Sequence, residues 1–367
     1  MSTSHRIASI QCLKVRLPFD HGGPAPLFAG KPRTTLDSVW MRVTLEDGLV
    51  GWGEAYGADP DAVVSIVRTR VEPLAMGRDA TEPGLACALD RTLHNMGRSG
   101  PVVHALSGLD IALWDLRGKI AGVPVYQLLG GARRKRIPAY ASLLQYYGDT
   151  ALVASNVRAS LEAGYRSVKL HERTVESVRA AREAMGAGVP LMLDTNCAWD
   201  VQGAAKALAS MADYDLLWVE EPIWPPEDLG NLVRLREMTG VPTAVGENAA
   251  SLQELLSIVG SQLADYVQPS AIKSGGLTTL QCVSEAAAGT RVRHSPQSAF
   301  FGPGFLATLH VLAAQEAEVA VERLFCRLGH VPYEHQVPFK DGAFHLGDEP
   351  GLGAEPEPLL LSSAFVS

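Results

Sequence analysis

The sequence predicts an α/β protein in which a (β/α)8-type barrel follows an N-terminal α+β domain. Three observations lead to this prediction. Short apolar runs alternate regularly with helix-like stretches after residue 136, carboxylates end three successive runs, and the pattern before residue 125 is different. Strands that alternate with helices at a steady spacing are typical of parallel βα units.

The first 125 residues show the alternation of antiparallel strands. Residues 9–19 and 35–56 alternate polar and apolar side chains, and LEDG at 45–48 supplies a turn. Residues 105–119, ALSGLDIALWDLRGK, are helix-like. Residues 19–35 are rich in Gly and Pro without periodicity, which predicts a mobile loop, with an inert surface loop as the alternative.

Eight strand-like runs follow, ending near residues 142, 171, 196, 222, 248, 270, 295 and 324. Helix-like segments lie between most of them. Eight such units predict a closed barrel, whose chemistry lies at the C-terminal ends of the strands. An open doubly wound sheet would need a Gly-rich phosphate turn after its first strand, and residues 137–149 have none.

Composition excludes several classes of protein. The net charge of −8 and the pI of about 5.7 give no basic patch for nucleic acid. Five cysteines without a CxxC motif argue against a disulfide framework and favour reduced thiols in the cytoplasm. No apolar run approaches the roughly 18 residues that a membrane helix needs, and the start does not resemble a signal peptide.

Three carboxylates end successive predicted strands: Asp194 in LMLDTN, Glu220 in LLWVEEP and Glu247 in TAVGEN. The separations are 26 and 27 residues, so each strand returns to the same rim of the barrel. A single acid there is usually a helix cap or a surface charge. Three acids in register predict an oxygen-ligand site for a hard cation such as Mg²⁺.

Basic side chains accompany this rim. Lys169 and His171 stand two apart in SVKLH and so point to one face of their strand, as Asp194 and Asn196 do on the next. Near a metal, such a basic pair suits a general base, although a salt-bridged rim is the alternative. His294 ends the seventh strand, where it could exchange a proton across a substrate or be a structural histidine.

Glu322 ends the eighth strand, with Arg323 as its alternative partner. Together these residues predict a metal that polarises a substrate carboxylate while bases move the proton on the neighbouring carbon. The intermediate is an ene-diolate stabilised by the metal, an arrangement known for the enolase superfamily.

The chain resembles the mandelate racemase/muconate lactonizing enzyme group of the enolase superfamily. DGLVGWGE at 47–54, the helix and loop at 105–131, and LMLDTN, VEEP and GEN carry the resemblance, which covers nearly the whole chain. It implies an α+β capping domain over residues 1–130, a barrel over 131–330, and a segment over 331–367 that returns to the capping domain. It also implies a homo-oligomer, Mg²⁺ on Asp194, Glu220 and Glu247, and a small-molecule carboxylate substrate.

The resemblance also implies roles for single residues. Lys169 and His171 match the Lys-x-Lys base motif with His in the second position. His294 resembles the histidine of the His-Asp dyad, and Glu322 the glutamate that binds the substrate carboxylate. Ser270 stands where racemase-like members have the dyad aspartate, so His294 is expected to act as a general acid.

We therefore expect a Mg²⁺-dependent acid sugar dehydratase, with an epimerase, racemase or cycloisomerase as the alternative. A metal-binding relative without catalysis is a second class of protein to consider, and a metal-dependent aldolase leaves the capping motifs unexplained. Asn196, Ser270 and Glu322 are candidates to bind substrate, and the capping loops add the last four candidates, which are His21, Lys31, Arg33 and Tyr56.

Overall fold

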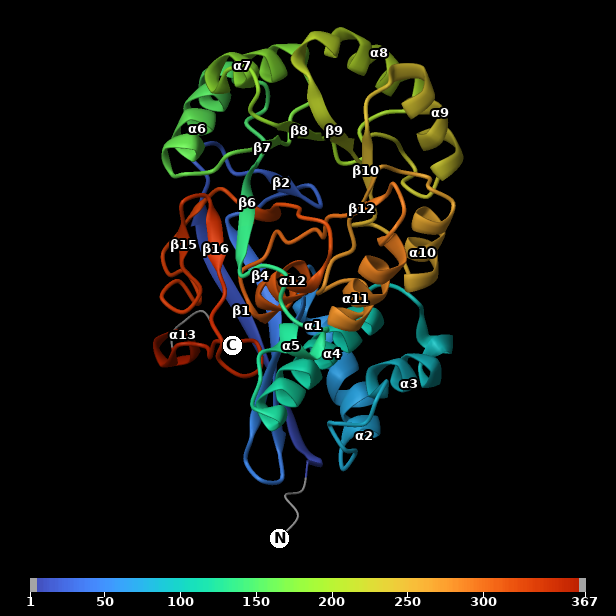
Figure 1. The fold of residues 1–367 in the computed structure, drawn as a ribbon, viewed down its shortest axis with the longest axis vertical. Coiled ribbons are helices and arrows are strands. Elements are labelled where there is room, and N and C mark those ends of the chain that lie inside the picture. Colours follow the sequence, from blue (N-terminus) through green and yellow to red (C-terminus); the bar gives the residue numbers. More distant parts are fainter. Residues whose placement is uncertain (1–4, 363–367) are drawn as a thin grey trace.

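The computed structural model describes residues 5–362 and places a ring of short strands and helices above an elongated α+β domain (Figure 1). Residues 1–4 and 363–367, the outer ends of the expected first and last segments, lie outside the described residues. The expected combination of an N-terminal α+β domain and a barrel is confirmed. No helix in the described part of the chain has the length and apolarity needed to cross a membrane.

The N-terminal domain is built on a sheet with the strand order β14-β1-β4-β5. Its strands are β1 (Ile7–Asp20), β4 (Thr35–Leu45), β5 (Val50–Tyr56) and β14 (Arg327–Leu328). β1 pairs antiparallel with β4 over most of its length, and β4 pairs with β5. The two antiparallel runs predicted for this domain are therefore present.

Helices cover this sheet, and the longest lies directly on β5. They are α1 (Pro60–Ile66), η1 (Val67–Val71), α2 (Glu72–Ala75), α3 (Leu85–Thr92), η2 (His94–Met96), α4 (Pro101–Ala121) and α5 (Val125–Leu128). A Cβ atom at Gly53 would come within 1.9 Å of the carbonyl oxygen of Gly108. Glycine at position 53 therefore permits the close approach of α4 to β5.

The aperiodic segment between β1 and β4 contains a short hairpin. β2 (Leu27–Phe28) pairs with β3 (Lys31–Pro32). The amide of Leu27 donates a hydrogen bond to the hydroxyl of Tyr147, which follows the first barrel strand, at 2.9 Å. The capping loop thus contacts the mouth of the barrel.

Eight parallel strands form the barrel. They are β6 (Arg136–Leu143), β7 (Val168–Leu170), β8 (Leu191–Asp194), β9 (Leu216–Glu220), β10 (Thr243–Val245), β11 (Tyr266–Val267), β12 (Arg293–His294) and β13 (Val321–Leu324). Neighbours pair in sequence order from β6 to β12, and β13 pairs with β6. All eight predicted strands are confirmed, most of them shorter than the apolar runs.

Within the described residues 5–362, seven α-helices and one short 3₁₀ helix surround the barrel. They are α6 (Thr150–Glu162), α7 (Val175–Met185), α8 (Val201–Ser210), η3 (Ala212–Tyr214), α9 (Leu229–Thr239), α10 (Leu252–Gly260), α11 (Gly276–Ala287) and α12 (Pro303–Ala314). Five begin after a residue whose side chain accepts a backbone hydrogen bond from the first turn, namely Asp149, Thr174, Asp200, Asp228 and Ser251. These caps set where each loop at the barrel mouth ends.

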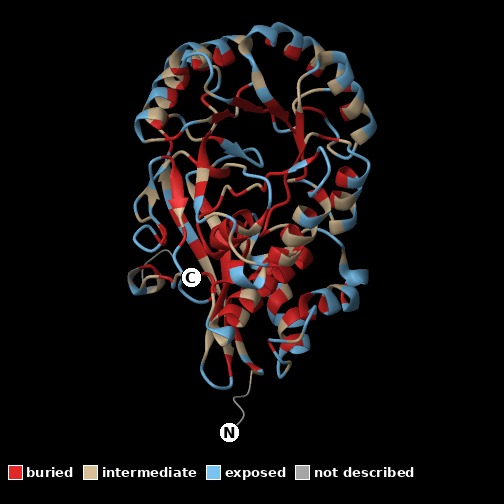
Figure 2. Cartoon of the chain, in the orientation of Figure 1, coloured by how far each residue is buried: buried red, intermediate tan, exposed pale blue. Residues whose placement is uncertain are grey.

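Helix α12 is the one barrel helix that the sequence patterns do not predict. Residues 303–313 are all buried, so the helix has no polar face and no amphipathic period. Figure 2 shows this buried helix between the barrel and the N-terminal domain, whereas the outer faces of the ring helices are exposed.

The chain after β13 contacts both parts of the molecule. β14 joins the N-terminal sheet, and the hairpin of β15 (Phe339–Lys340) and β16 (Ala343–His345) pairs with β6. The last described element is α13 (Pro358–Ser362). Thus the chain after β13 adds strands to the N-terminal sheet and to the barrel.

Buried polar contacts hold the N-terminal domain over the barrel. Glu54 on β5 accepts a hydrogen bond from the amide of Gly304 in α12 at 2.9 Å. Asp110 in α4 accepts bonds from the amide and the hydroxyl of Thr278 in α11, at 2.9 and 2.6 Å. These contacts fix the face of the N-terminal domain that meets the barrel mouth.

Candidate active site

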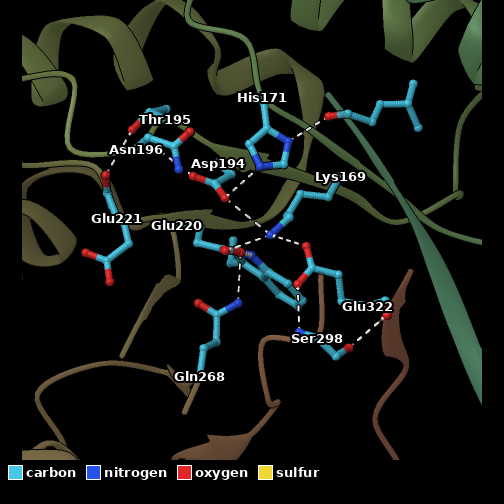
Figure 3. A network of polar contacts seen from close by, with 12 residues as sticks. Lys169, His171, Asp194, Thr195, Asn196, Glu220, Glu221, Gln268, Ser298 and Glu322 are labelled. Carbon is cyan, nitrogen blue, oxygen red and sulfur yellow. Dashed lines mark hydrogen bonds and ion pairs between the residues drawn. The ribbon is translucent and has the colours of Figure 1, made fainter. Parts of the chain in front are cut away.

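Lys169 lies on β7 and His171 directly follows it, and both side chains point toward the carboxylates of neighbouring strands (Figure 3). Val168 and Leu170 are buried in the main hydrophobic core. Because side chains alternate along a strand, Lys169 then faces the interior of the barrel. The structure therefore places Lys169 and His171 on the same face of this strand, beside Asp194.

Lys169 is the centre of a buried ion-pair network. Its Nζ lies 2.7 Å from Glu220 Oε1, 2.9 Å from Glu322 Oε1 and 3.3 Å from Asp194 Oδ2. Burial opposes the charge of the ammonium group, but the surrounding carboxylates, Glu220 foremost, hold the pKa of Lys169 well above its ordinary value. Lys169 therefore carries its proton in this structure.

His171 bridges two acceptors. Its Nδ1 lies 2.6 Å from the carbonyl oxygen of Leu143, and its Nε2 lies 3.1 Å from Asp194 Oδ2. Because both neighbours can only accept, both ring nitrogens donate and the imidazole is positively charged. Burial opposes this charge, but Asp194 outweighs burial and raises the pKa of His171. His171 is a proton donor in this state.

Glu220 is held by residues that the sequence analysis does not single out. Its Oε2 accepts hydrogen bonds from Trp218 Nε1 at 3.1 Å and from Gln268 Nε2 at 2.8 Å. Trp218 belongs to an aromatic cluster inside the barrel with Tyr140 and Tyr266. Gln268 is a polar residue directly after the short strand β11, which is the signal that could have found it.

Glu322 contributes from the eighth strand. Its Oε2 accepts a hydrogen bond from the amide of Ser298 at 3.0 Å, which leaves Oε1 for Lys169. Arg323, the alternative partner, packs its guanidinium over the ring of Phe301 at 3.6 Å. Glu322 therefore belongs to the Lys169 network.

A cavity of about 520 Å³ lies between the N-terminal domain and the barrel mouth. Of the predicted site residues, it is lined by Arg33, Tyr56, Lys169, His171, Asp194, Asn196, Glu247 and Glu322. The predicted residues outside this lining are His21, Lys31, Glu220, Ser270 and His294. Its size is typical of a small-molecule site.

Asn196 lies beside Asp194, which stands two residues before it in the chain. Its backbone amide donates a hydrogen bond to Asp194 Oδ1 at 3.0 Å. The residue has a φ of 46°, in the left-handed region that asparagine tolerates better than most residues. This turn fixes Asp194 and places Asn196 in the cavity wall.

His294 is not among the residues that line the cavity, and its Nε2 is buried without a hydrogen-bond partner within residues 5–362. It is 3% exposed, and its Nδ1 contacts Gln315 Oε1 at 2.8 Å. Burial lowers the pKa of His294 to about 4, so its ring is neutral at neutral pH. From the segment after β12, Gln297 lines the cavity together with Ala299, Phe300 and Phe301, and its Oε1 is buried without a hydrogen-bond partner within residues 5–362.

The four predicted capping residues divide into two groups. Arg33 and Tyr56 line the cavity. His21 is buried elsewhere, with Nε2 at 2.8 Å from the carbonyl oxygen of Pro24 and its ring stacked on Tyr146. Lys31 is exposed on the hairpin outside the lining. The spacing of residues in an aperiodic loop gives no signal that separates these groups.

The carboxylates suit a divalent cation by their chemistry. Within residues 5–362, no three His, Cys, Asp or Glu side chains form a group that could hold a metal ion, and the Nζ atom of Lys169 contacts both Asp194 and Glu220. Nevertheless, Asp194, Glu220 and Glu247 offer hard oxygen donors from three successive strands, as Mg²⁺ requires. Burial raises the pKa of Glu247, and a cation would favour its charged form.

Other cavity residues escaped the sequence analysis as candidates. Their polar members are Ser38, Gln145, Asn248 and Gln297, and Asp37, Glu54, Arg173 and Lys273 add charged groups. Lys273 lies with its Nζ 5.3 Å from the ring centre of Tyr56. Amides and hydroxyls in loops have no periodic pattern, so sequence alone does not distinguish them from surface residues.

Comparison with known proteins identifies the family. Residues 152–359 match the family Enolase C-terminal domain-like, and residues 26–130 match the N-terminal domain of mandelate racemase / muconate lactonizing enzyme. The chain belongs to the mandelate racemase/muconate lactonizing enzyme family. The first match covers more than half of the chain, so the resemblance read from the motifs is confirmed.

Family members of several named activities are similar to this chain. A D-galactonate dehydratase family member from Pseudarthrobacter chlorophenolicus is 30% identical, over 86% of this chain and 89% of its own. The D-galactarolactone cycloisomerase of Agrobacterium fabrum is also 30% identical, over 86% and 88%. A mandelate racemase/muconate lactonizing protein from Paracoccus denitrificans, crystallised with magnesium, is 28% identical with a TM-score of 0.83, over 97% and 96%.

Proposed function

We propose that this protein is a Mg²⁺-dependent dehydratase of sugar acids, which removes the proton next to the carboxylate and eliminates the neighbouring hydroxyl. The observation that carries the proposal is the position of Lys169 and His171 on one side of a cavity walled by carboxylates. The similarity to a D-galactonate dehydratase family member supports it.

In this proposal Asp194, Glu220 and Glu247 hold the cation. Bound Mg²⁺ supplies positive charge that offsets these carboxylates and the charge developing on the substrate carboxylate. Trp218 and Gln268 orient Glu220 through its Oε2, and the amide of Asn196 orients Asp194. The protein thus holds its acidic side chains before substrate arrives.

Lys169 is the proposed base. Burial favours its neutral form and the carboxylates favour its charged form. Neutralising Asp194 and Glu220 therefore lowers the pKa of Lys169 and frees Nζ to accept the α-proton. Glu322 remains as the counter-ion that steadies the resulting ammonium group.

His171 is the proposed acid. The α C–H electron pair forms the C=C bond of an enol as the β C–O bond breaks, and the leaving hydroxide takes the proton from His171 Nε2 to depart as water. The enol then tautomerises to a 2-keto acid. Because Lys169 and His171 act from one side of the cavity, the elimination is syn. His294 has no part in this proposal, because burial keeps its ring neutral and it therefore carries no extra proton to donate.

A cycloisomerase or epimerase is the second candidate. Either reaction needs a proton-transfer group in addition to the Lys169 and His171 pair. Lys273 lines the cavity from the segment after β11 and is the amine available for that role. The similarity to a D-galactarolactone cycloisomerase supports this candidate.

The test is a screen of sugar acids with Mg²⁺ for 2-keto acid formation, with ¹H NMR in D₂O on the same samples. Loss of keto acid in both Lys169→Met and His171→Asn, but not in the exposed control Lys206→Met on α8, supports dehydration. A deuterated isomer without keto acid, lost in Lys273→Met, supports the isomerase. If a sugar acid binds but neither proton exchange nor product is detected, the result would support a non-catalytic binding protein instead of an enzyme.

A further inference from the structure

We propose that Arg33 forms a second anion site at the capping end of the cavity, so that the substrate is a dicarboxylic sugar acid. The inference rests on the proposed function, because it assigns the substrate class of the same site. It depends on a guanidinium group that lines the cavity and forms no direct ion pair within the described residues 5–362.

In the part of the chain that the structure describes, Arg33 has no carboxylate in direct contact, although the charge of nearby Asp37 partly stabilises its guanidinium. Within residues 5–362 it forms no ion pair, and its only side-chain hydrogen bond runs from Nε to the carbonyl oxygen of Thr35 at 3.2 Å. Asp37, which also lines the cavity, pairs with Arg16 at 3.1 Å. Both terminal nitrogens of Arg33 therefore remain available for a ligand.

The guanidinium is held in place by its neighbours. The ring of Phe28 lies 4.8 Å from the Arg33 Cζ atom, and the bond from Nε fixes the other side of the fork. Partial burial removes water from the guanidinium and lowers the pKa of Arg33. A bound anion would offset this cost of desolvating the positive charge. A planar fork with two free donors matches a carboxylate in bidentate geometry.

The rest of the cavity fits a polyhydroxyl chain. Gln145, Asn196, Asn248 and Gln297 line it together. Amide side chains both donate and accept hydrogen bonds, as sugar hydroxyls do. A chain with one carboxylate at the Lys169 cluster and a second at Arg33 would contact cationic groups from both the barrel and the capping loop, since both residues line the cavity. Arg173 also lines the cavity but is exposed, so solvent already hydrates its charge.

The experiment compares each diacid with the monoacid of the same configuration, using galactarate with galactonate and glucarate with gluconate. The enzyme is assayed with Mg²⁺ as wild type, Arg33→Met and the control Arg42→Met, which makes the same change on β4 where Arg42 contacts Gln11. We expect Arg33→Met to reduce the preference for the diacid in kcat/KM by roughly 10- to 100-fold, the range for hydrogen bonds to a charged group.

Binding separates this inference from the proposed reaction. Calorimetric titration of galactarate and galactonate with Mg²⁺ present shows whether the diacid binds more tightly and whether Arg33→Met removes the difference. If it does while no acid is turned over, the dehydratase proposal fails and the anion site stands. Equal losses for diacid and monoacid in Arg33→Met, a wild-type preference for the monoacid, or the same effect in Arg42→Met would each overturn the anion site.

Discussion

Ser270 lies opposite Gln297, and not opposite His294, in the pairing between the segments that follow β11 and β12. The partner of His294 is Val267, at the end of β11. Gln297 lines the cavity, whereas His294 is turned toward Gln315. The wall next to these two strands therefore presents an amide to the substrate instead of an imidazole.

This pairing predicts different outcomes for His294 and Gln297. Replacing Gln297 with Ala removes a polar contact to the substrate and should lower kcat/KM by roughly 10- to 100-fold. His294→Asn should leave kcat within about threefold, because the neutral ring does not reach the cavity. Steady-state kinetics normalised to the folded fraction tests both variants. A collapse of turnover in His294→Asn would restore the general-acid role that the motifs imply.

Lys169→Met should slow proton transfer strongly and destabilise the fold. Loss of the base should lower kcat by roughly 10³-fold. It also leaves three buried carboxylates without their cation, which should cost about 3–5 kcal/mol of unfolding free energy at pH 7 without Mg²⁺. Urea denaturation and α-proton exchange in D₂O measure the two effects.

The matched control for Lys169→Met is Lys206→Met, whose side chain is exposed on α8. It should change neither quantity, since it removes a charge that water already solvates. Wild-type stability in Lys169→Met would show that the ion-pair network is not formed in solution.

Mg²⁺ should stabilise the folded protein through Asp194, Glu220 and Glu247. At a hundredfold excess over Kd, a ligand that binds only the folded state adds about 2.7 kcal/mol to the unfolding free energy. Thermal denaturation across a MgCl₂ series, at ionic strength matched with NaCl, should show a rise in Tm. Glu247→Gln should move this rise to higher Mg²⁺ concentrations, whereas Glu237→Gln, exposed on α9, should not. Identical curves for both variants would remove Glu247 from the metal site.

Glu54 should make stability depend on pH. Burial raises the pKa of Glu54 to about 7 from its ordinary value of 4.5. Below pH 4.5 Glu54 is protonated in both the folded and the unfolded chain, so it does not make the unfolding free energy depend on pH. Between pH 4.5 and 7 the unfolded chain releases the proton while the folded chain keeps it, and stability falls as pH rises.

The unfolding free energy lost through Glu54 amounts to about 3 kcal/mol at most, because each unit of pKa difference between the folded and unfolded chain corresponds to about 1.36 kcal/mol. Glu54→Gln keeps an acceptor for the amide of Gly304 and cannot ionise, so it should gain stability relative to wild type at pH 7.5 more than at pH 5. Urea denaturation at the two pH values measures the difference. If Glu54→Gln and wild type differ in unfolding free energy by the same amount at pH 5 and pH 7.5, then Glu54 is already ionised in the folded protein across this range.

The barrel could be predicted because its elements repeat. Each strand is buried between the barrel interior and the helices, so it appears as an apolar run, and most helices have one exposed face. The same regularity predicted that Asp194 and Glu220 lie near Lys169, since strand ends with equal spacing meet on one rim. Helix α12 was beyond this reasoning, because a helix buried on all sides has no polar stripe.

By itself, the sequence determined the order of the barrel strands and of most helices between them, the rim on which the acids lie, and the shared face of Lys169 and His171. These follow from local periodicity, which a single chain displays directly. Only the tertiary structure decided that Gln297 and not His294 faces the cavity, and that Arg33 reaches it while Lys31 does not. β12 is only two residues long, and residues beyond a strand end or within an aperiodic loop no longer alternate. Their directions are set by packing against distant parts of the chain, which no spacing in the sequence records.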